Sequence, residues 1–169
     1  RAHGASERKI SIISEKTKTS RALNALHETF FDDNLKDIHI FITGVGNVGG
    51  YLMEQINVQK KYIAQNLKLN LKVLGISNSK KMVISDSEID LNNWSKLLDK
   101  SKSKANFNDF QNKILELNLR NSLFVDNTAS EVIPSTYSKY LKNGVGIVTC
   151  NKIANSVDYS NYELSLIHI

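Results

Sequence analysis

The sequence predicts an α/β fold with a doubly wound, mostly parallel sheet. Short apolar runs alternate with longer segments whose apolar residues recur every three or four positions. One short run, 38–42, passes directly into a glycine-rich turn, and Gly144 stands as a stop signal between a helical pattern and the last apolar run. Because strand–helix–strand connections are right-handed crossovers, such alternation builds a parallel sheet flanked by helices.

The expected elements follow one another within residues 36–163, the predicted main domain. Strands are expected at the short apolar runs 38–42, 71–76, 82–84, 122–126 and 145–149. Helices are expected from Val48 onward, around Trp94, over 107–117, and from Ile133 to Leu141, where Pro134 near the start costs little. In the first helix, the stripe expected to face the sheet consists of Val48, Leu52, Ile56 and Ile63.

Residues 1–33 are predicted to be separate from this domain, because Asp32-Asp33-Asn34 breaks the pattern before it. An apolar stretch over 10–13 predicts one strand, and the spacing of Leu23, Leu26 and Phe30 predicts one helix, which together are too little to fold alone. Residues 164–169 are expected to be a truncated tail. The chain starts at Arg1 instead of methionine and stops within this apolar tail, so we expect both ends to lie inside a longer protein.

The composition is that of an ordinary globular domain, with 41% hydrophobic and 23% charged residues in 169. The net charge of +5 is spread in single residues and pairs, which favours a solvated surface over a nucleic-acid partner. A single cysteine, Cys150, excludes an internal disulfide, fits a cytoplasmic location and is expected to be buried and inert. No apolar stretch of about 18 residues is present, so we expect no membrane span.

The glycine-rich turn has the spacing Gly44-x-Gly46-x-x-Gly49 between a buried strand and an amphipathic helix. This context is typical of a Rossmann-type dinucleotide site. Gly44 permits the tight turn, Gly46 lets the backbone approach a pyrophosphate, and Gly49 allows the helix to pack closely on the strand. The free N–H groups at the helix start then face the phosphates. The alternative is a glycine-rich turn that binds nothing.

The end of the second strand bears on which dinucleotide is bound. NAD-selective domains usually have an acidic residue there, which takes the ribose hydroxyls. This chain has Ser77-Asn78-Ser79-Lys80-Lys81 instead, and a neutral end with two lysines favours NADP, because an ammonium group can pair with the extra phosphate. NAD stays possible, since the alternative is that both lysines are only solvated. We expect Asn78, Ser79 and Lys80 to contact the cofactor.

Four segments in order resemble the NAD(P)-binding domain of homoserine dehydrogenases, and the resemblance covers most of 36–163. These segments are Ile42 to Gly50, Gly75 to Lys80, Val125 to Ser130 and Val148 to Asn155. The piece from His3 to Ser11 resembles the last part of the regulatory ACT region of aspartokinases. The order of the two resemblances is that of the fused bifunctional enzyme, so residues 1–33 are expected to be a strand–helix remnant of an ACT domain.

The resemblance implies hydride transfer between NAD(P)H and L-aspartate 4-semialdehyde, giving L-homoserine. It implies that Gly44, Gly46, Asn47 and Val48 hold the pyrophosphate, that Thr128 and Ser130 lie near the nicotinamide, and that Asn127 and Asn151 also contact the cofactor. Lys152 is the implied catalytic residue, approaching the substrate carbonyl. Hydride addition builds negative charge on that oxygen, which an ammonium group stabilises.

In this family the main substrate-binding and acid–base residues come from a later catalytic domain. We therefore expect this chain to bind NADPH but to turn over slowly or not at all. The parent is expected to be a homo-oligomer that acts on aspartate semialdehyde and homoserine. His3, His27, His39 and His168 show no metal-ligand spacing, so no metal is expected. The alternatives are a non-catalytic nucleotide-sensing module and another NADP-linked dehydrogenase.

Overall fold

The computed structural model describes residues 35–153, together with 2–3, 10–11, 19, 22–23 and 26. The chain divides into two compact units, Arg1–Asp33 and Asn34–Ile169. In the first unit, β1 (Ala2–His3) pairs antiparallel with β2 (Ile10–Ser11), and residues 19, 22–23 and 26 are helical. The rest of the predicted strand over 10–13, Phe30 of the predicted helix, and the predicted segments after Ile153 lie outside the described residues. The ACT assignment stays a prediction.

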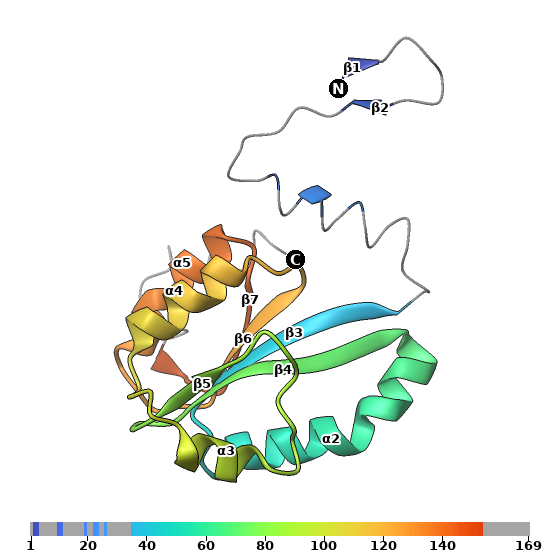
Figure 1. Ribbon diagram of the computed structural model, residues 1–169. Helices are drawn as coiled ribbons and strands as arrows, with labels where there is room; N and C mark the ends of the chain where they lie inside the picture. Colours follow the sequence, from blue (N-terminus) through green and yellow to red (C-terminus); the bar gives the residue numbers. More distant parts are fainter. Residues whose placement is uncertain are drawn as a thin grey trace. The chain divides into compact units, whose positions relative to one another are not determined.

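The second unit is built on a five-stranded sheet in the order β5-β4-β3-β6-β7 (Figure 1). Its strands are β3 (Lys36–Thr43), β4 (Leu69–Ser77), β5 (Met82–Ile84), β6 (Ser122–Asp126) and β7 (Gly146–Thr149). All pairs are parallel except β4 with β5, which is antiparallel at one edge. The predicted mostly parallel sheet is confirmed.

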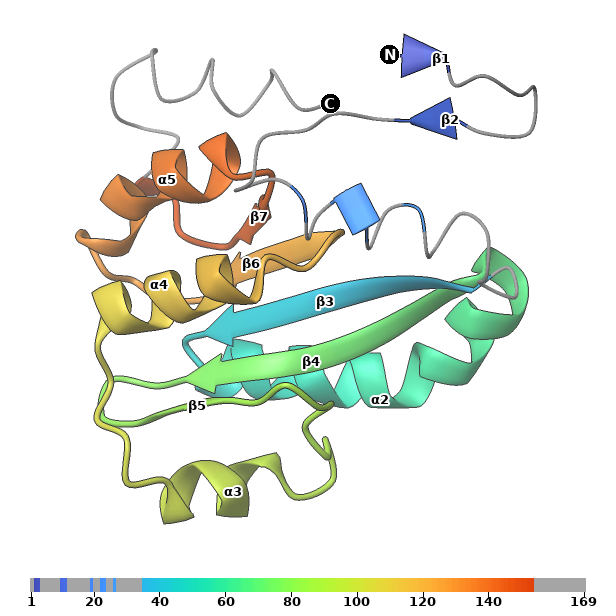
Figure 2. The same cartoon turned by 45° about the horizontal axis from the view of Figure 1, so that its top comes forward.

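Helices cover both faces of this sheet (Figures 1 and 2). The helices α2 (Asn47–Leu67) and α3 (Trp94–Lys100) lie on one face, and α4 (Phe107–Leu117) and α5 (Tyr137–Lys142) on the other. Side chains alternate along β3, so that Ile40 and Ile42 join the first core while Phe41 joins the second. The doubly wound Rossmann-type fold is therefore confirmed.

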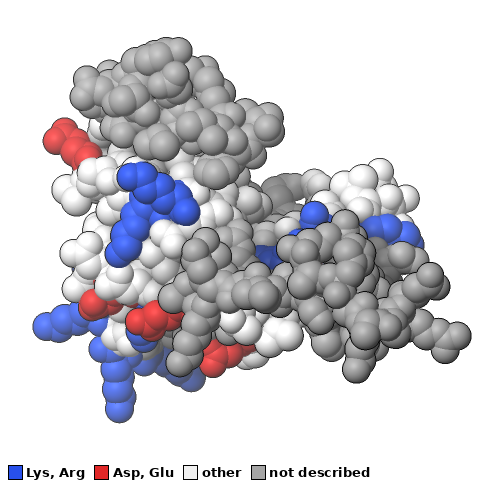
Figure 3. Space-filling model, turned by 90° about the horizontal axis from the view of Figure 1, so that it is seen from above, with Lys and Arg blue, Asp and Glu red and all other residues white. Residues whose placement is uncertain are grey.

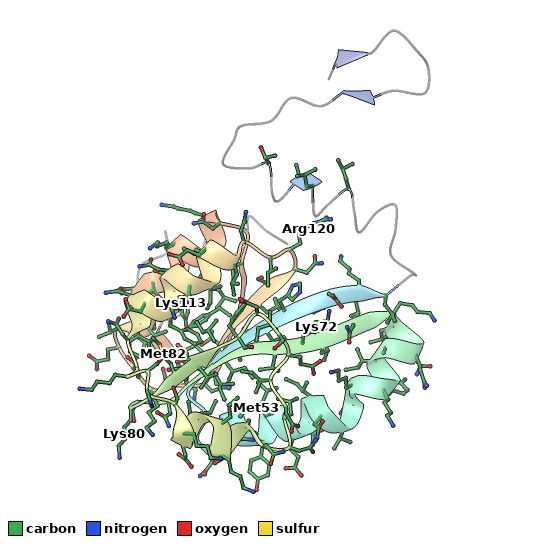
Figure 4. The ribbon with its side chains drawn as sticks, in the orientation of Figure 1. Met53, Lys72, Lys80, Met82, Lys113 and Arg120 are labelled. Atoms are coloured by element: carbon green, nitrogen blue, oxygen red, sulfur yellow. The ribbon has the colours of Figure 1, made fainter. Side chains whose placement is uncertain are left out.

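The buried face of α2 differs from the predicted stripe. Its buried residues are Gly49, Met53 and Ile56, whereas Val48 is 54% exposed. The prediction at Val48 was wrong because the face that packs on the sheet is centred between Met53 and Ile56, and Val48 in the first turn lies to the side of that face. Met53 points from α2 toward the sheet (Figure 4).

The other predicted helix signals have clear outcomes. Pro134 lies in a 3₁₀ turn, Ile133–Thr136, that leads into α5. Gly144 adopts a φ of 72° and donates its N–H to the carbonyl of Leu141 at 2.9 Å, which ends α5 as expected. Among the described helices, none has the length and apolarity needed to cross a bilayer. On the face seen in Figure 3, the described Lys and Arg side chains lie among acidic and uncharged ones.

Truncating Met53 tests the core under α2. Met53 is fully buried, so Met53→Ala leaves a cavity and is expected to lower the free energy of unfolding by about 2–5 kcal/mol. The matched control is Val58→Ala on the same helix, where 71% of the residue is exposed and a loss of less than about 0.5 kcal/mol is expected. Urea unfolding followed by circular dichroism measures both; equal losses would show that α2 does not pack as described.

Candidate functional site

The turn after β3 is fixed by close contacts that only glycine tolerates. Gly44 has a φ of +83°, and a Cβ there would lie 2.7 Å from the backbone carbon of Asn127. Its N–H donates to the carbonyl oxygen of Ser77 at 2.9 Å, so the turn is held against the end of β4. A Cβ on Gly49 would lie 2.4 Å from the carbonyl oxygen of Gly44. Both glycines therefore have the packing roles that the sequence predicts.

The start of α2 presents donors to open space. Gly46 is the N-cap, no side chain among the described residues caps the helix, and the first turn holds no acidic residue. The N–H groups of the first turn lack partners within a helix, and the helix dipole makes this end positive. No described heavy atom lies within 4 Å of where a Cβ of Gly46 would stand. This end of α2 is suited to an anionic group.

A cleft of about 740 Å³ lies beside this turn, a size typical of small-molecule sites. Three segments form it: the turn after β3, the loop after β4 with the chain before α4, and the loop after β6. Their lining residues are Thr43, Gly44, Val45, Gly46, Asn78, Ser79, Lys80, Ala105, Phe107, Asn127, Thr128 and Ser130. The cleft thus opens at the carboxyl ends of β3 and β6, where the strand order reverses and α/β sheets bind ligands.

An unpaired donor at the cleft supports a ligand there. The Asn127 Nδ2 atom is buried and has no hydrogen-bond partner among the described residues. It lies 3.5 Å from the place that a Cβ on Gly49 would take, next to the start of α2. A buried donor left without a partner is costly, and a phosphate or amide oxygen of a dinucleotide would satisfy it. The residues present therefore fit the predicted cofactor.

The loop after β4 separates the two predicted lysines. The Asn78 Oδ1 atom accepts from the N–H groups of Lys80 at 2.8 Å and Lys81 at 2.7 Å, which fixes the turn. The Lys81 ammonium donates to the carbonyl oxygen of Asp99 at the end of α3. Lys80 is exposed, lines the cleft, and stands beyond the carboxyl end of β4 (Figure 4). Lys80 is therefore the lysine that is placed to meet a ligand.

The four parallel strands end in polar residues at one level. Thr43 pairs with Ser77 and with Asp126, and Asp126 pairs with Thr149. Asp126 is fully buried, and its carboxylate accepts four hydrogen bonds. The donors are the N–H of Thr128 at 2.8 Å, its hydroxyl at 2.7 Å, the Tyr137 hydroxyl at 2.6 Å and Asn151 Nδ2 at 3.3 Å. Burial raises the pKa of Tyr137, and so does its bond to Asp126, which keeps this hydroxyl a donor.

The predicted residues after β7 lie outside the cleft lining. Asn151 is 4% exposed and its side chain is engaged internally, donating to Asp126 and to the Ser130 carbonyl at 2.7 Å and accepting from the Ile153 N–H at 3.1 Å. Lys152 is exposed, and its ammonium makes no hydrogen bond or ion pair with the residues that the structure describes. Cys150 is exposed, so the expectation that it is buried was wrong: its strand has already ended.

The remaining predicted residues are placed as follows. Asn47 and Val48 stand exposed in the first turn of α2, and Asn47 lines a second cleft with Leu91 and Trp94. Asp126, Tyr137 and Phe107 were not predicted as site residues. An ionisable residue closing an apolar run was a usable signal for Asp126. Phe107 lies at the cleft together with Ala105, whose N–H donates to the Lys80 carbonyl, a contact between segments distant in sequence. Within the described residues no cluster suited to a metal ion is present.

Together, the doubly wound sheet, the glycine turn and the cleft at its switch point define a dinucleotide-binding domain of the Rossmann type. A family model described as "Homoserine dehydrogenase, NAD binding domain" matches residues 44–166. The chain belongs to this family, and its cofactor is a nicotinamide dinucleotide.

Relatives of known activity extend the match upstream of that domain. The bifunctional aspartokinase/homoserine dehydrogenase of Buchnera aphidicola is 33% identical over 162 residues, covering 96% of this chain. The enzyme of the same name from Haemophilus influenzae is 34% identical over 161 residues and 95% of this chain. The chain spans 20% of the length of each.

Solved structures share the fold. A hyperthermophilic archaeal homoserine dehydrogenase in complex with NADPH gives a TM-score of 0.60 at 22% identity, covering 78% of this chain and 41% of that one. A homoserine dehydrogenase from Thermoplasma acidophilum gives 0.58 at 21% identity, covering 77% of this chain and 40% of that one. At these identities the likeness supports the fold.

Two glycine substitutions separate packing from binding. Gly49→Ala forces a Cβ against the Gly44 carbonyl and is expected to destabilise the domain by several kcal/mol, about 2–4. Gly46→Ala meets no described atom and should cost less than about 1 kcal/mol, yet its methyl enters the space beside the phosphate donors and should weaken NADPH binding about tenfold or more. Thermal unfolding and fluorescence titration measure the two effects; full NADPH affinity in Gly46→Ala would contradict the assignment.

The buried tyrosines of α5 predict a loss of stability in alkali. Burial raises the pKa of Tyr137 and Tyr140 in the folded chain above the ordinary value near 10. Above about pH 10 the hydroxyls of these tyrosines lose their protons in the unfolded chain but keep them in the folded chain. The free energy of unfolding therefore has its full value below that pH and falls as the pH rises. Tyr137→Phe should make this fall shallower by about 1.4 kcal/mol per pH unit. Urea unfolding from pH 9 to 11 checks it; parallel curves for both proteins would refute it.

Proposed function

We propose that this chain is the cofactor-binding part of a homoserine dehydrogenase within a bifunctional aspartokinase–homoserine dehydrogenase. The observation that carries the proposal is the family match over residues 44–166, which contains the glycine turn and the cleft. The relatives support the bifunctional arrangement, because a match of 162 residues leaves few residues of the unit Arg1–Asp33 outside it. The proposed reaction is hydride transfer between a nicotinamide dinucleotide and L-aspartate 4-semialdehyde, which yields L-homoserine.

Each segment has a proposed part in that reaction. The cofactor supplies the hydride. The first turn of α2 and Asn127 bind its phosphates, and the loop from Asn127 to Ser130 orients its nicotinamide end. The exposed ammonium of Lys152, just after β7, stabilises negative charge on the substrate oxygen or helps supply its proton. Substrate orientation comes from a later domain, as the resemblance implies.

We further propose a preference for NADPH over NADH. NAD-selective domains usually have at this position a carboxylate, which would repel a 2′-phosphate. Here β4 ends in Ser77 and is followed by Asn78, and the exposed Lys80 lines the cleft beside them. A phosphate on the adenosine ribose would find in Lys80 a positive partner at the rim of the cleft. NAD binding remains the alternative for which the turn itself is equally suited.

Substituting each lysine tests this preference. Lys80→Ala is expected to weaken NADPH binding about tenfold while changing NADH binding little, because only the 2′-phosphate contact is removed. Lys81→Ala is the matched control, since its ammonium bonds to Asp99, and the ratio of the two affinities should stay as in the unsubstituted chain. Fluorescence titrations with both nucleotides measure the ratio. If Lys80→Ala leaves it unchanged, Lys80 does not select the cofactor.

The chain is expected to bind NADPH without rapid turnover. Cofactor orientation without substrate orientation leaves out much of the proximity effect in catalysis. The measurement is NADPH oxidation with L-aspartate 4-semialdehyde by residues 1–169, set against the full-length Haemophilus influenzae relative at equal molarity. Saturable NADPH binding with turnover far below the relative is the expected result. Comparable turnover would mean that this chain carries a complete active site.

A further inference from the structure

We infer that Asp126 is a positioning residue that joins the loop after β6 to the loop after β7, and so holds the nicotinamide half of the cofactor site and Lys152 in register. The inference rests on the proposed function. Asn151 also joins the two loops through its bond to the Ser130 carbonyl, whereas Asp126, which the sequence did not predict as a site residue, neither lines the cleft nor reaches solvent.

The carboxylate of Asp126 divides its bonds between the two loops. Its Oδ1 accepts both the N–H and the hydroxyl of Thr128, at 2.8 and 2.7 Å, and thus fixes the loop that lines the cleft. Its Oδ2 accepts from Asn151 Nδ2 at 3.3 Å and from the Tyr137 hydroxyl at 2.6 Å. One buried group therefore sets two loops that follow different strands.

The same network brackets Lys152 on both sides. The Tyr137 hydroxyl also lies 2.9 Å from Thr149 Oγ1, which accepts the N–H of Asn151 at 2.8 Å. The Asn151 side chain then accepts the Ile153 N–H at 3.1 Å and donates to the Ser130 carbonyl at 2.7 Å. The backbone around Lys152 is thus tied to Asp126 through Thr149 and Asn151, and across to the cleft loop at Ser130.

This arrangement explains why the strand ends in a buried carboxylate. A buried charge without a cation beside it is costly unless its lone pairs are filled, and here four donors fill them. Removing any one donor leaves part of the Asp126 carboxylate without a hydrogen bond, so its remaining bonds are expected to rearrange. Because those bonds reach both loops, the two loops are expected to move together. A site that must hold a nicotinamide ring against a substrate carbonyl requires such mutual placement.

Tyr137→Phe is the principal test, because it removes a single oxygen from the network. Tyr140→Phe on the same helix is the matched control, since the Tyr140 ring stacks on Phe124 and its hydroxyl bonds to no described residue. Asp126→Asn is the second variant, used when circular dichroism shows it folded. Each is titrated with NADPH and with 2′,5′-ADP, which carries the adenylate half and the 2′-phosphate but no nicotinamide.

We expect Tyr137→Phe to weaken NADPH binding about tenfold while leaving 2′,5′-ADP binding unchanged, and Tyr140→Phe to alter neither. Hydrogen exchange should rise together at the amides of Thr128, Asn151 and Ile153. A folded Tyr137→Phe that binds NADPH as tightly as the unsubstituted chain, or loses affinity equally for both ligands, would overturn the positioning role. If the unsubstituted chain bound neither ligand, the proposed function would fail first, and the inference with it.

Discussion

The site depends on one close approach between backbone segments. A Cβ at Gly49 would stand 2.4 Å from the carbonyl oxygen of Gly44, and a Cβ at Gly44 would meet the backbone of Asn127. Because neither position carries a side chain, the first turn of α2 sits directly over the end of β3 and beside β6. The helix donors and the loop after β6 then meet in one cleft. Any larger residue would push these elements apart and separate the donors from the loop.

Two neighbouring buried polar groups at the end of β6 differ in whether they have hydrogen-bond partners. The Asp126 carboxylate has four donors, whereas Asn127 Nδ2, one residue later, has no partner among the described residues. A fully satisfied network rigidifies the backbone around it, while an unsatisfied donor is stable only when something else completes it. The adjacent pair therefore marks a boundary between the framework of the domain and the surface that meets the cofactor.

Much of the fold follows from local sequence signals. The runs that became β3, β4, β6 and β7 and the stop at Gly144 are short-range patterns, and the glycine spacing has a direct steric cause. What the sequence did not reveal depends on long-range packing. The face of α2 is set by the sheet beneath Met53, and the roles of Lys80 and Lys81 differ because Lys80 lines the cleft while Lys81 donates to the Asp99 carbonyl in α3. Likewise, the bonds of Asp126 join residues up to 25 positions apart.

The polar groups at the two ends of the parallel strands explain why the site lies at the carboxyl ends. Toward the amino ends of the strands, polar groups are paired with one another. Asp37 bonds to Lys72 and, at 2.7 Å, to Asn70, and His39 Nδ1 lies 2.8 Å from the Arg120 carbonyl oxygen. Burial opposes the charge of Asp37, but its bonds to Lys72 and Asn70 hold the pKa of the carboxyl below its usual value. At the carboxyl ends, the glycines of the turn carry no side chains that could fill the space. Among the described residues, no side chain caps the first N–H groups of α2, and Asn127 Nδ2 has no partner. Asn127 Nδ2 and the first turn of α2, which folding leaves without side-chain partners among the described residues, lie at this end, so a ligand can complete hydrogen bonds there.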